Sequence, residues 1–178
     1  MQPQFLVVTA EMSAPTITLD PADSSFSLAA CGEPQSGFER IGSGKYGLQF
    51  DAPSRDVRLI RGKTDVDYVV DIIRAKKGDD RLEFWFGPYA MSSTPDDKQL
   101  VESEVFVTRN VVMPPGLVVG SGGGVIGMDT RGSQPNGEKW RQVAIGFEGA
   151  RYRDVTPANA ALFDSIIDSA CWIAYPQN

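Results

Sequence analysis

Three aspartates near the middle of the chain have a spacing that could serve carboxylate chemistry. Asp65, Asp67 and Asp71 lie two and four residues apart, so an extended strand would present all three on one face, with i and i+2 neighbours about 6.6 Å apart. Clusters of carboxylate oxygens bind Ca²⁺, and paired carboxylates catalyse the hydrolysis of glycosidic bonds. The spacing differs from that of an EF-hand loop, and a solvated sheet face is the simpler interpretation.

Two tryptophans are the main candidates for a binding surface. Trp85 and Trp140 each alternate with apolar residues on an expected strand, so both point away from the face that those residues would bury. Aromatic rings beside polar groups form stacking platforms for sugars or peptides. We therefore expect a ligand near these two tryptophans and Tyr89, with Asp65 and Asp67 as polar partners. Packing of both rings in the core is the simpler interpretation.

Two glycine-containing segments resemble phosphate-binding loops. The segment 122–127 matches G-x-G-x-x-G, but the residues after it do not form a helix-like pattern, and such a loop binds a pyrophosphate only between a strand and a helix. A hairpin or a β-bulge explains it better. Gly44-Lys45 resembles the end of a P-loop, but Glu39 and Tyr46 stand where that motif needs Gly and Ser or Thr. A turn before a strand explains this segment.

A local group of cations, Arg55, Arg58, Arg61 and Lys63, stands out in an acidic chain. Such a group could bind an anionic ligand. Ion pairs with nearby aspartates at the surface are the simpler interpretation.

Composition excludes several function classes. The chain has no histidine, which removes Ser-His-Asp and Cys-His nucleophile systems and most zinc, copper and iron sites. The net charge of −6 is unsuited to nucleic acid, which requires a basic surface. No apolar run approaches the ~20 residues that cross a bilayer. The sequence predicts no cofactor, no metal and no integral membrane segment, and it favours a protein that is not an enzyme.

Cys31 and Cys171 are the two cysteines of the chain. No C-x-x-C motif is present, so a redox site of the thioredoxin type is excluded. We expect the two residues to form a disulfide, which indicates an exported protein. The chain shows no signal peptide, so we expect that segment to be absent from it. A cytoplasmic protein with two buried thiols is the alternative.

The chemistry-bearing residues would be positioned by many short strands. Alternating apolar residues and turn signals predict strands over 5–9, 16–19, 46–50, 57–60, 66–75, 81–86, 104–112, 125–128, 140–147 and 150–155. Residues 131–139 are expected to form a turn-rich loop. Segments 66–75 and 81–86 are joined by a short glycine-containing turn, which is typical of a hairpin.

A C-terminal amphipathic helix is expected over 156–173. Thr156 suits the N-cap and Pro157 the first helical position. Apolar residues then recur at helical spacing and form one stripe, comprising Leu162, Phe163, Ile166, Ile167, Ala170 and Cys171. Because Cys171 falls on this stripe, the expected disulfide would join the helix to the sheet.

The expected fold is α+β, with a mainly antiparallel sheet and the C-terminal helix packed on it. A barrel closed by the helix is the alternative. We expect a single domain over 1–178, with an irregular segment over 1–44 and the sheet over 45–155. The order of strands followed by a helix resembles that of lipocalin-like barrels and of small exported α+β domains. The resemblance rests on element order alone, so no residue is carried over.

These observations favour a non-enzymatic, exported or cell-surface domain that binds a ligand or a protein. A carboxylate-based hydrolase acting on a carbohydrate is one alternative. A small acidic inhibitor or immunity-type protein is the other.

Overall fold

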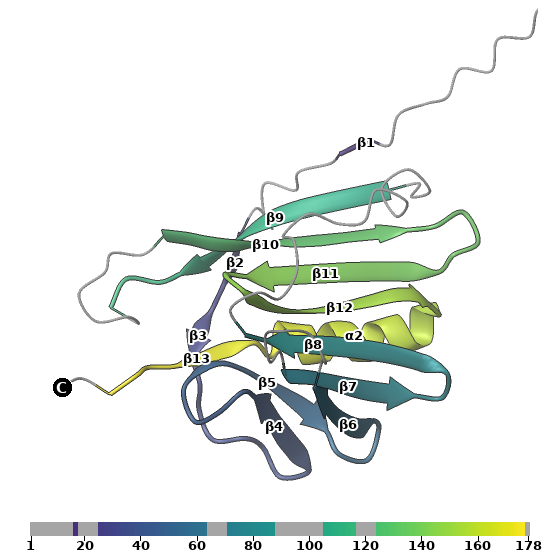
Figure 1. The fold of residues 1–178 in the computed structure, drawn as a ribbon. Coiled ribbons are helices and arrows are strands. Elements are labelled where there is room, and N and C mark those ends of the chain that lie inside the picture. The colour runs from purple at the N-terminus through teal and green to yellow at the C-terminus, as the bar shows by residue number, and fades with distance from the viewer. Residues whose placement is uncertain (1–15, 18–24, 64–70, 88–104, 117–123, 177–178) are drawn as a thin grey trace, which may run out of the picture.

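The computed structural model describes residues 16–17, 25–63, 71–87, 105–116 and 124–176. One helix, α2 (Pro157–Asp168), and two β-sheets account for most of them (Figure 1). The larger sheet consists of β1 (Thr16–Ile17), β2 (Ser25–Ser27), β6 (Arg58–Lys63), β7 (Asp71–Lys77), β8 (Asp80–Phe86), β9 (Val105–Met113), β10 (Gly124–Ser133), β11 (Lys139–Ile145) and β12 (Glu148–Val155). The smaller sheet consists of β3 (Ala29–Ala30), β4 (Phe38–Gly42), β5 (Gly47–Pro53) and β13 (Cys171–Ile173).

The fold is α+β, as expected, and most of the described strand pairs are antiparallel, but both sheets are mixed and open, so the alternative of a closed barrel is wrong. The larger sheet has the order β1-β9-β10-β11-β12-β8-β7-β6, with β2 also paired to β9, and the smaller has the order β3-β13-β5-β4. Strands β1 and β2 run parallel to β9, and β3 runs parallel to β13. Short turns impose antiparallel pairing only on strands that are neighbours in the chain, and these N-terminal strands meet partners far away in sequence.

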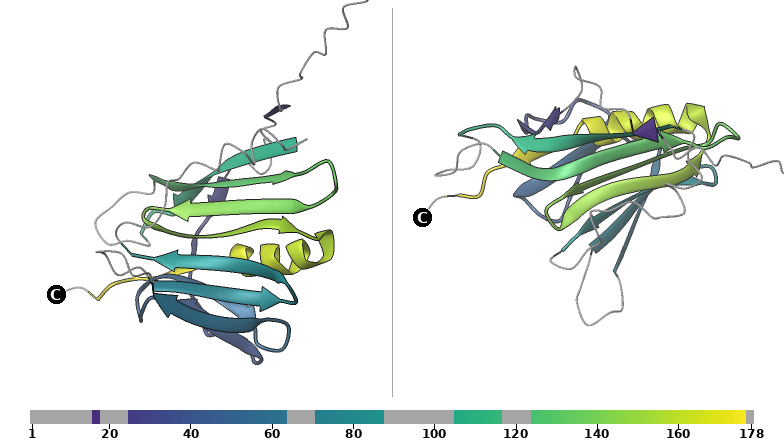
Figure 2. Two further views of the ribbon diagram at one scale, coloured as in Figure 1. Left: turned by 45° about the vertical axis from the view of Figure 1, so that its right-hand side comes forward. Right: turned by 90° about the horizontal axis from the view of Figure 1, so that it is seen from above.

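The core lies between the larger sheet, the smaller sheet and α2. The helix contacts β11 and β12 of one sheet and β5 of the other (Figures 1 and 2). Leu82, Phe84 and Phe86 are buried in this core, as their alternation predicts, and Phe163 is buried with them from α2. Apolar burial on this scale is the main driving force for the fold.

The C-terminal helix is confirmed but shorter than expected. It begins with Pro157 at the first helical position, although the side chain of Thr156 makes no capping hydrogen bond and contacts Asp80 instead, at 3.3 Å. The helix ends at Asp168, so the last two apolar residues of the expected stripe lie beyond it, Ala170 just before β13 and Cys171 within it. The apolar pattern continues past the helix because Ala170 and Cys171 are buried as well, so the prediction of a helix up to residue 173 is wrong.

The expected disulfide between Cys31 and Cys171 is present. It joins β13 to the residue after β3, so it links two segments of the smaller sheet and does not tie the helix to a sheet.

Strand β10 extends further than the sequence indicated. It runs to Ser133 and pairs with both β9 and β11. Residues 131–133, which were expected to lie in a loop, therefore belong to this strand. The interpretation of the glycine cluster as a bulge holds for its described part, because the register shifts between Val125 and Gly127. At Gly127 a Cβ atom would lie 1.9 Å from the carbonyl oxygen of Ala144. Only glycine fits that approach of the two strands.

Candidate functional site

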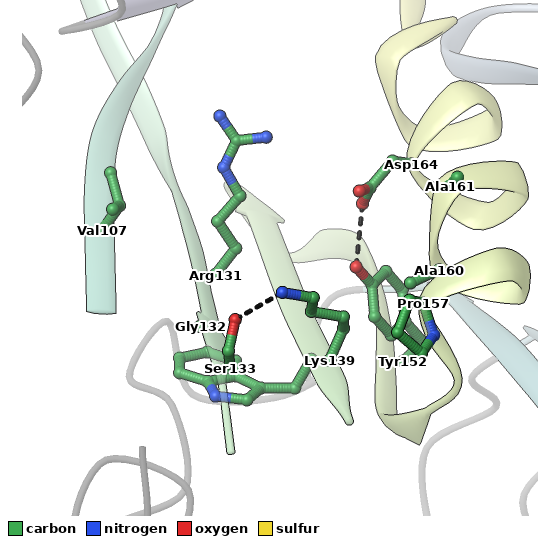
Figure 3. A pocket seen from close by; sticks show the side chains of 11 residues that line it. Val107, Arg131, Gly132, Ser133, Lys139, Tyr152, Pro157, Ala160, Ala161 and Asp164 are labelled. Carbon is green, nitrogen blue, oxygen red and sulfur yellow. Dashed lines mark hydrogen bonds between the residues drawn. The ribbon is translucent and has the colours of Figure 1, made fainter. Parts of the chain in front are cut away.

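A pocket of about 300 Å³ lies where α2 crosses the ends of β10, β11 and β12. Figure 3 shows its side chains converging from the sheet on one side and from the helix on the other. Its lining combines apolar and polar groups and comprises Val107, Arg131, Gly132, Ser133, Lys139, Trp140, Tyr152, Pro157, Ala160, Ala161 and Asp164. An apolar wall with a few convergent polar groups is typical of small-molecule sites.

Two cations come from the sheet side of the pocket. Lys139 donates a hydrogen bond to the Ser133 hydroxyl at 2.7 Å, which holds its ammonium group at the pocket wall. Arg131 is half-buried, and among the residues that the structure describes it has no hydrogen-bond or ion-pair partner. Its guanidinium points into the open space beside Asp164 (Figure 3). A half-buried guanidinium with unused donors favours an anionic ligand.

The helix side of the pocket carries one carboxylate. Asp164 accepts a hydrogen bond from the Tyr152 hydroxyl at 2.9 Å and another from the Arg141 Nη1 at 3.2 Å. Both of these donors come from the sheet. The carboxylate is therefore positioned by the sheet before any ligand enters.

A buried ion network lies directly behind this wall. Arg141 is fully buried and donates from Nε to Asp129 Oδ1 and from Nη2 to Asp129 Oδ2, both at 2.9 Å. Arg109 donates from Nε to Asp129 Oδ2 at 2.7 Å, and its guanidinium lies 4.9 Å from the centre of the Phe26 ring. Two-point contacts of this kind fix the relative position of the strands that carry them.

Arg141 also reaches from the sheet to the helix. Besides its bond to Asp164, its Nη2 lies 2.7 Å from Asp168 Oδ1. One guanidinium thus joins β10, β11 and α2. The network sets the distance between the helix and the sheet, and so the width of the pocket.

The network shifts three pKa values. Burial alone would raise the pKa of Asp129, but hydrogen bonds and charges from Arg141 and Arg109 outweigh it and hold that pKa below its usual range. Burial opposes the charged form of Arg141 as well, yet its carboxylate partners raise its pKa further. Burial and the adjacent Asp164 raise the pKa of Tyr152 far above the ordinary value for tyrosine. At neutral pH Asp129 and Arg141 are therefore charged and the phenol of Tyr152 keeps its proton.

This state of ionisation suits binding better than proton transfer. A general acid needs a pKa near the working pH, whereas Asp129 is held ionised and Tyr152 is held neutral. Glu148 has a pKa raised by burial, but it does not line the pocket. Among the described residues, no group of three or more His, Cys, Asp or Glu side chains could hold a metal ion.

Of the five residues expected to bind a ligand, two lie within the described residues and three lie outside them. Trp85 and Trp140 are both buried, with 3% and 0% of their surface exposed. Trp85 faces away from the main core, as its alternation predicts, and packs on Ile72 and beside Gly149. Trp140 lines the pocket. Tyr89, Asp65 and Asp67 lie outside the described residues.

Sequence reasoning missed Arg131 and Lys139, because the segment between them was expected to be a loop. The burial of Arg141, and its need for a partner, could have been predicted from the sequence. Arg141 shares its strand face with Val143 and Ile145, which are buried, and a charge on a buried face requires a partner. Asp129 and Asp164 carry no such signal, because neither strand register nor helix docking can be read from one sequence.

Comparison of the chain with protein-family models, with curated proteins and with solved structures gives no significant match. The described part of the chain also contains no helix that is both long and apolar enough to cross a bilayer.

Proposed function

We propose that this protein is a non-enzymatic ligand-binding domain that takes a small organic anion into the pocket between α2 and the larger sheet. The half-buried Arg131 carries the proposal, since its guanidinium faces the pocket and has no partner among the described residues. A buried or half-buried charge is costly unless a counter-charge is supplied. The missing counter-charge is what the ligand would bring.

The rest of the lining favours a ligand with an apolar body. Trp140, Ala160 and Ala161 supply apolar surface, and Lys139 adds a second cation close to Arg131. A volume of about 300 Å³ is at the lower end of the range for small-molecule sites. An aromatic or branched carboxylate combines this size with the required charge.

The disulfide supports an extracytoplasmic location for this binding function. Disulfides form and persist in oxidising compartments and are rare in the cytosol. We infer that the domain acts outside the cytoplasm, where the Cys31–Cys171 bridge would be maintained.

An NMR titration with benzoate tests the proposal. We expect benzoate to shift backbone signals of β10, β11 and α2 at millimolar concentration, and benzyl alcohol, which lacks the charge, to shift them much less. Arg131→Gln should weaken benzoate binding about tenfold, which corresponds to one charge-assisted contact.

The control is Lys45→Gln, which removes an exposed cation between β4 and β5, away from the pocket, and it should leave benzoate binding unchanged. Equal weakening by both variants, or equal binding of benzoate and benzyl alcohol, would overturn the assignment of the pocket. Asp65 and Asp67, on which the hydrolase alternative depends, lie outside the described residues, and the inhibitor alternative stays a prediction.

A further inference from the structure

The outer face of the larger sheet carries a row of directly opposed cations. Arg58 of β6 pairs in register with Lys76 of β7, and Lys76 pairs with Arg81 of β8. Their chain neighbours Ala75 and Leu82 are buried in the core, so the three cations lie on the opposite face, away from α2. We call these three residues the cationic row. It is assembled by strand register from three separate segments.

The direct opposition of like charges in the cationic row does not stabilise the fold. Like charges directly opposite each other on neighbouring strands are unfavourable. Within the described residues, Glu83 is the carboxylate paired with this part of the face, and it is shared between Arg81 at 3.1 Å and Arg74 at 3.8 Å. Arg81 remains more than half exposed, and Arg58 is exposed. A chain of net charge −6 thus concentrates positive charge here at a cost in stability.

Two hollows continue the positive charge at the ends of the row. At the β6 end a hollow of about 660 Å³ adds Arg55, with Asp56 as an acidic neighbour. It also contains Lys77, which follows Lys76 on the other face of β7, and Arg61, which is ion-paired with Glu39 at 3.5 Å. At the β8 end a hollow of about 260 Å³ adds Arg151 and Arg153, with Glu83 and Asp154 as its acidic members. The positive surface is therefore elongated and runs across the strands, from β6 to β12.

We propose that this face binds an acidic polysaccharide, a chain of sugars bearing carboxylate or sulfate groups, laid across strands β6, β7, β8 and β12. Neighbouring strands are about 4.8 Å apart, so the row offers a cation at regular short steps to a polymer with regularly spaced anions. Guanidinium groups bind carboxylates and sulfates through two parallel hydrogen bonds. This surface is separate from the pocket under α2.

Other polyanions fit the face less well. Single-stranded nucleic acid depends on stacking of its bases on aromatic rings, and no aromatic residue belongs to the row. A peptide strand added at the edge of a sheet runs along that edge, whereas the row runs across the strands. An acidic polysaccharide needs none of these features.

Affinity measurements on immobilised polymers test the proposal. We expect polygalacturonate and dextran sulfate to bind at low salt and neutral dextran not to bind. The triple variant Arg58→Gln/Lys76→Gln/Arg81→Gln should bind about tenfold more weakly, as expected for the loss of three ionic contacts at the surface. Its melting temperature should not fall, so weaker binding would not be due to misfolding.

The single variant Arg81→Gln is compared with Lys45→Gln. Both variants remove one positive charge, but Lys45 is an exposed residue far from the cationic row in sequence. We expect only Arg81→Gln to weaken binding. Equal effects of the two variants, or undiminished binding by the triple variant, would refute the proposal. Binding of poly-glutamate or single-stranded DNA in preference to both acidic polysaccharides would refute it as well.

Discussion

Arg141 is the charged residue on which the candidate pocket most depends. It is fully buried and contacts Asp129, Asp164 and Asp168 at once. A buried ion pair adds little net stability, because the charges lose their hydration, but removal of one partner leaves the other uncompensated. The residue is therefore better understood as a positioning element for α2 than as a source of stability.

Arg141→Gln is expected to lower the free energy of unfolding by ~3–5 kcal/mol, because it leaves Asp129 buried with Arg109 as its remaining partner. Denaturant unfolding followed by far-UV circular dichroism measures this loss. The double variant Arg141→Leu/Asp129→Leu should recover much of it, since apolar groups of similar volume need no counter-charge. A single variant as stable as the parent protein would show that the network is not formed.

Two residues of the network make stability depend on pH at both ends of the range. Asp129 has a lowered pKa in the folded state, so its contribution is complete above about pH 4, the ordinary value for an unfolded aspartate, and is lost as the pH falls through the lowered pKa. Tyr152 has a raised pKa, so its contribution is complete below about pH 10 and declines above that value.

Thermal unfolding from pH 2 to pH 11 should therefore show an acid limb that is flatter in Asp129→Asn and an alkaline limb that is flatter in Tyr152→Phe. The second variant also loses the hydrogen bond to Asp164, so its stability at pH 7 should fall by about 1 kcal/mol. An alkaline limb unchanged by Tyr152→Phe would contradict the raised pKa.

Strand β7 presents two cations on one face with opposite roles. Lys76 stands directly opposite Arg58 and Arg81, whereas Arg74 stands opposite Glu83 and pairs with it. Cross-strand register thus makes one cation unfavourable and the other favourable for folding. The two residues are a matched pair on a single strand.

We expect Lys76→Gln to raise the free energy of unfolding by roughly 0.2–1 kcal/mol and Arg74→Gln to lower it by a similar amount. Chemical denaturation at low ionic strength measures both changes, and added salt should reduce them by screening. Destabilisation by Lys76→Gln would mean that the lysine has a structural role that the register does not reveal.

The elements that sequence predicted well are those whose pattern is local. Alternation of apolar residues gave the buried face of β8, and the Thr156-Pro157 pair gave the start of α2. The parallel pairing of β2 and β3 could not be predicted, because it depends on partners far away in the chain. For the same reason, neither the pocket around Arg131 nor the cationic row was visible before register was known.

The bridge between Cys31 and Cys171 links residues that are 140 positions apart, so it closes a loop that contains most of the chain. We expect Cys31→Ser/Cys171→Ser to lower the free energy of unfolding by ~2–5 kcal/mol, because the unfolded chain gains the entropy that the bridge removes. Denaturant unfolding with and without reductant measures the difference. Under reductant, the parent protein should have the same free energy of unfolding as the variant. The control is that reductant leaves the free energy of unfolding of the variant unchanged.

The bridge also determines how the molecule would bear tension. A force applied to the two ends of the chain passes from Cys31 to Cys171 through the sulfur atoms, so the intervening loop, which includes β4 to β12 and α2, carries none of it. In single-molecule stretching, the reduced protein should release about 50 nm more chain than the oxidised protein, from an extended length of ~3.5 Å per residue. Equal extensions would show that the bridge does not carry the load. A domain of this kind can hold its pocket and its outer face intact while it is being pulled.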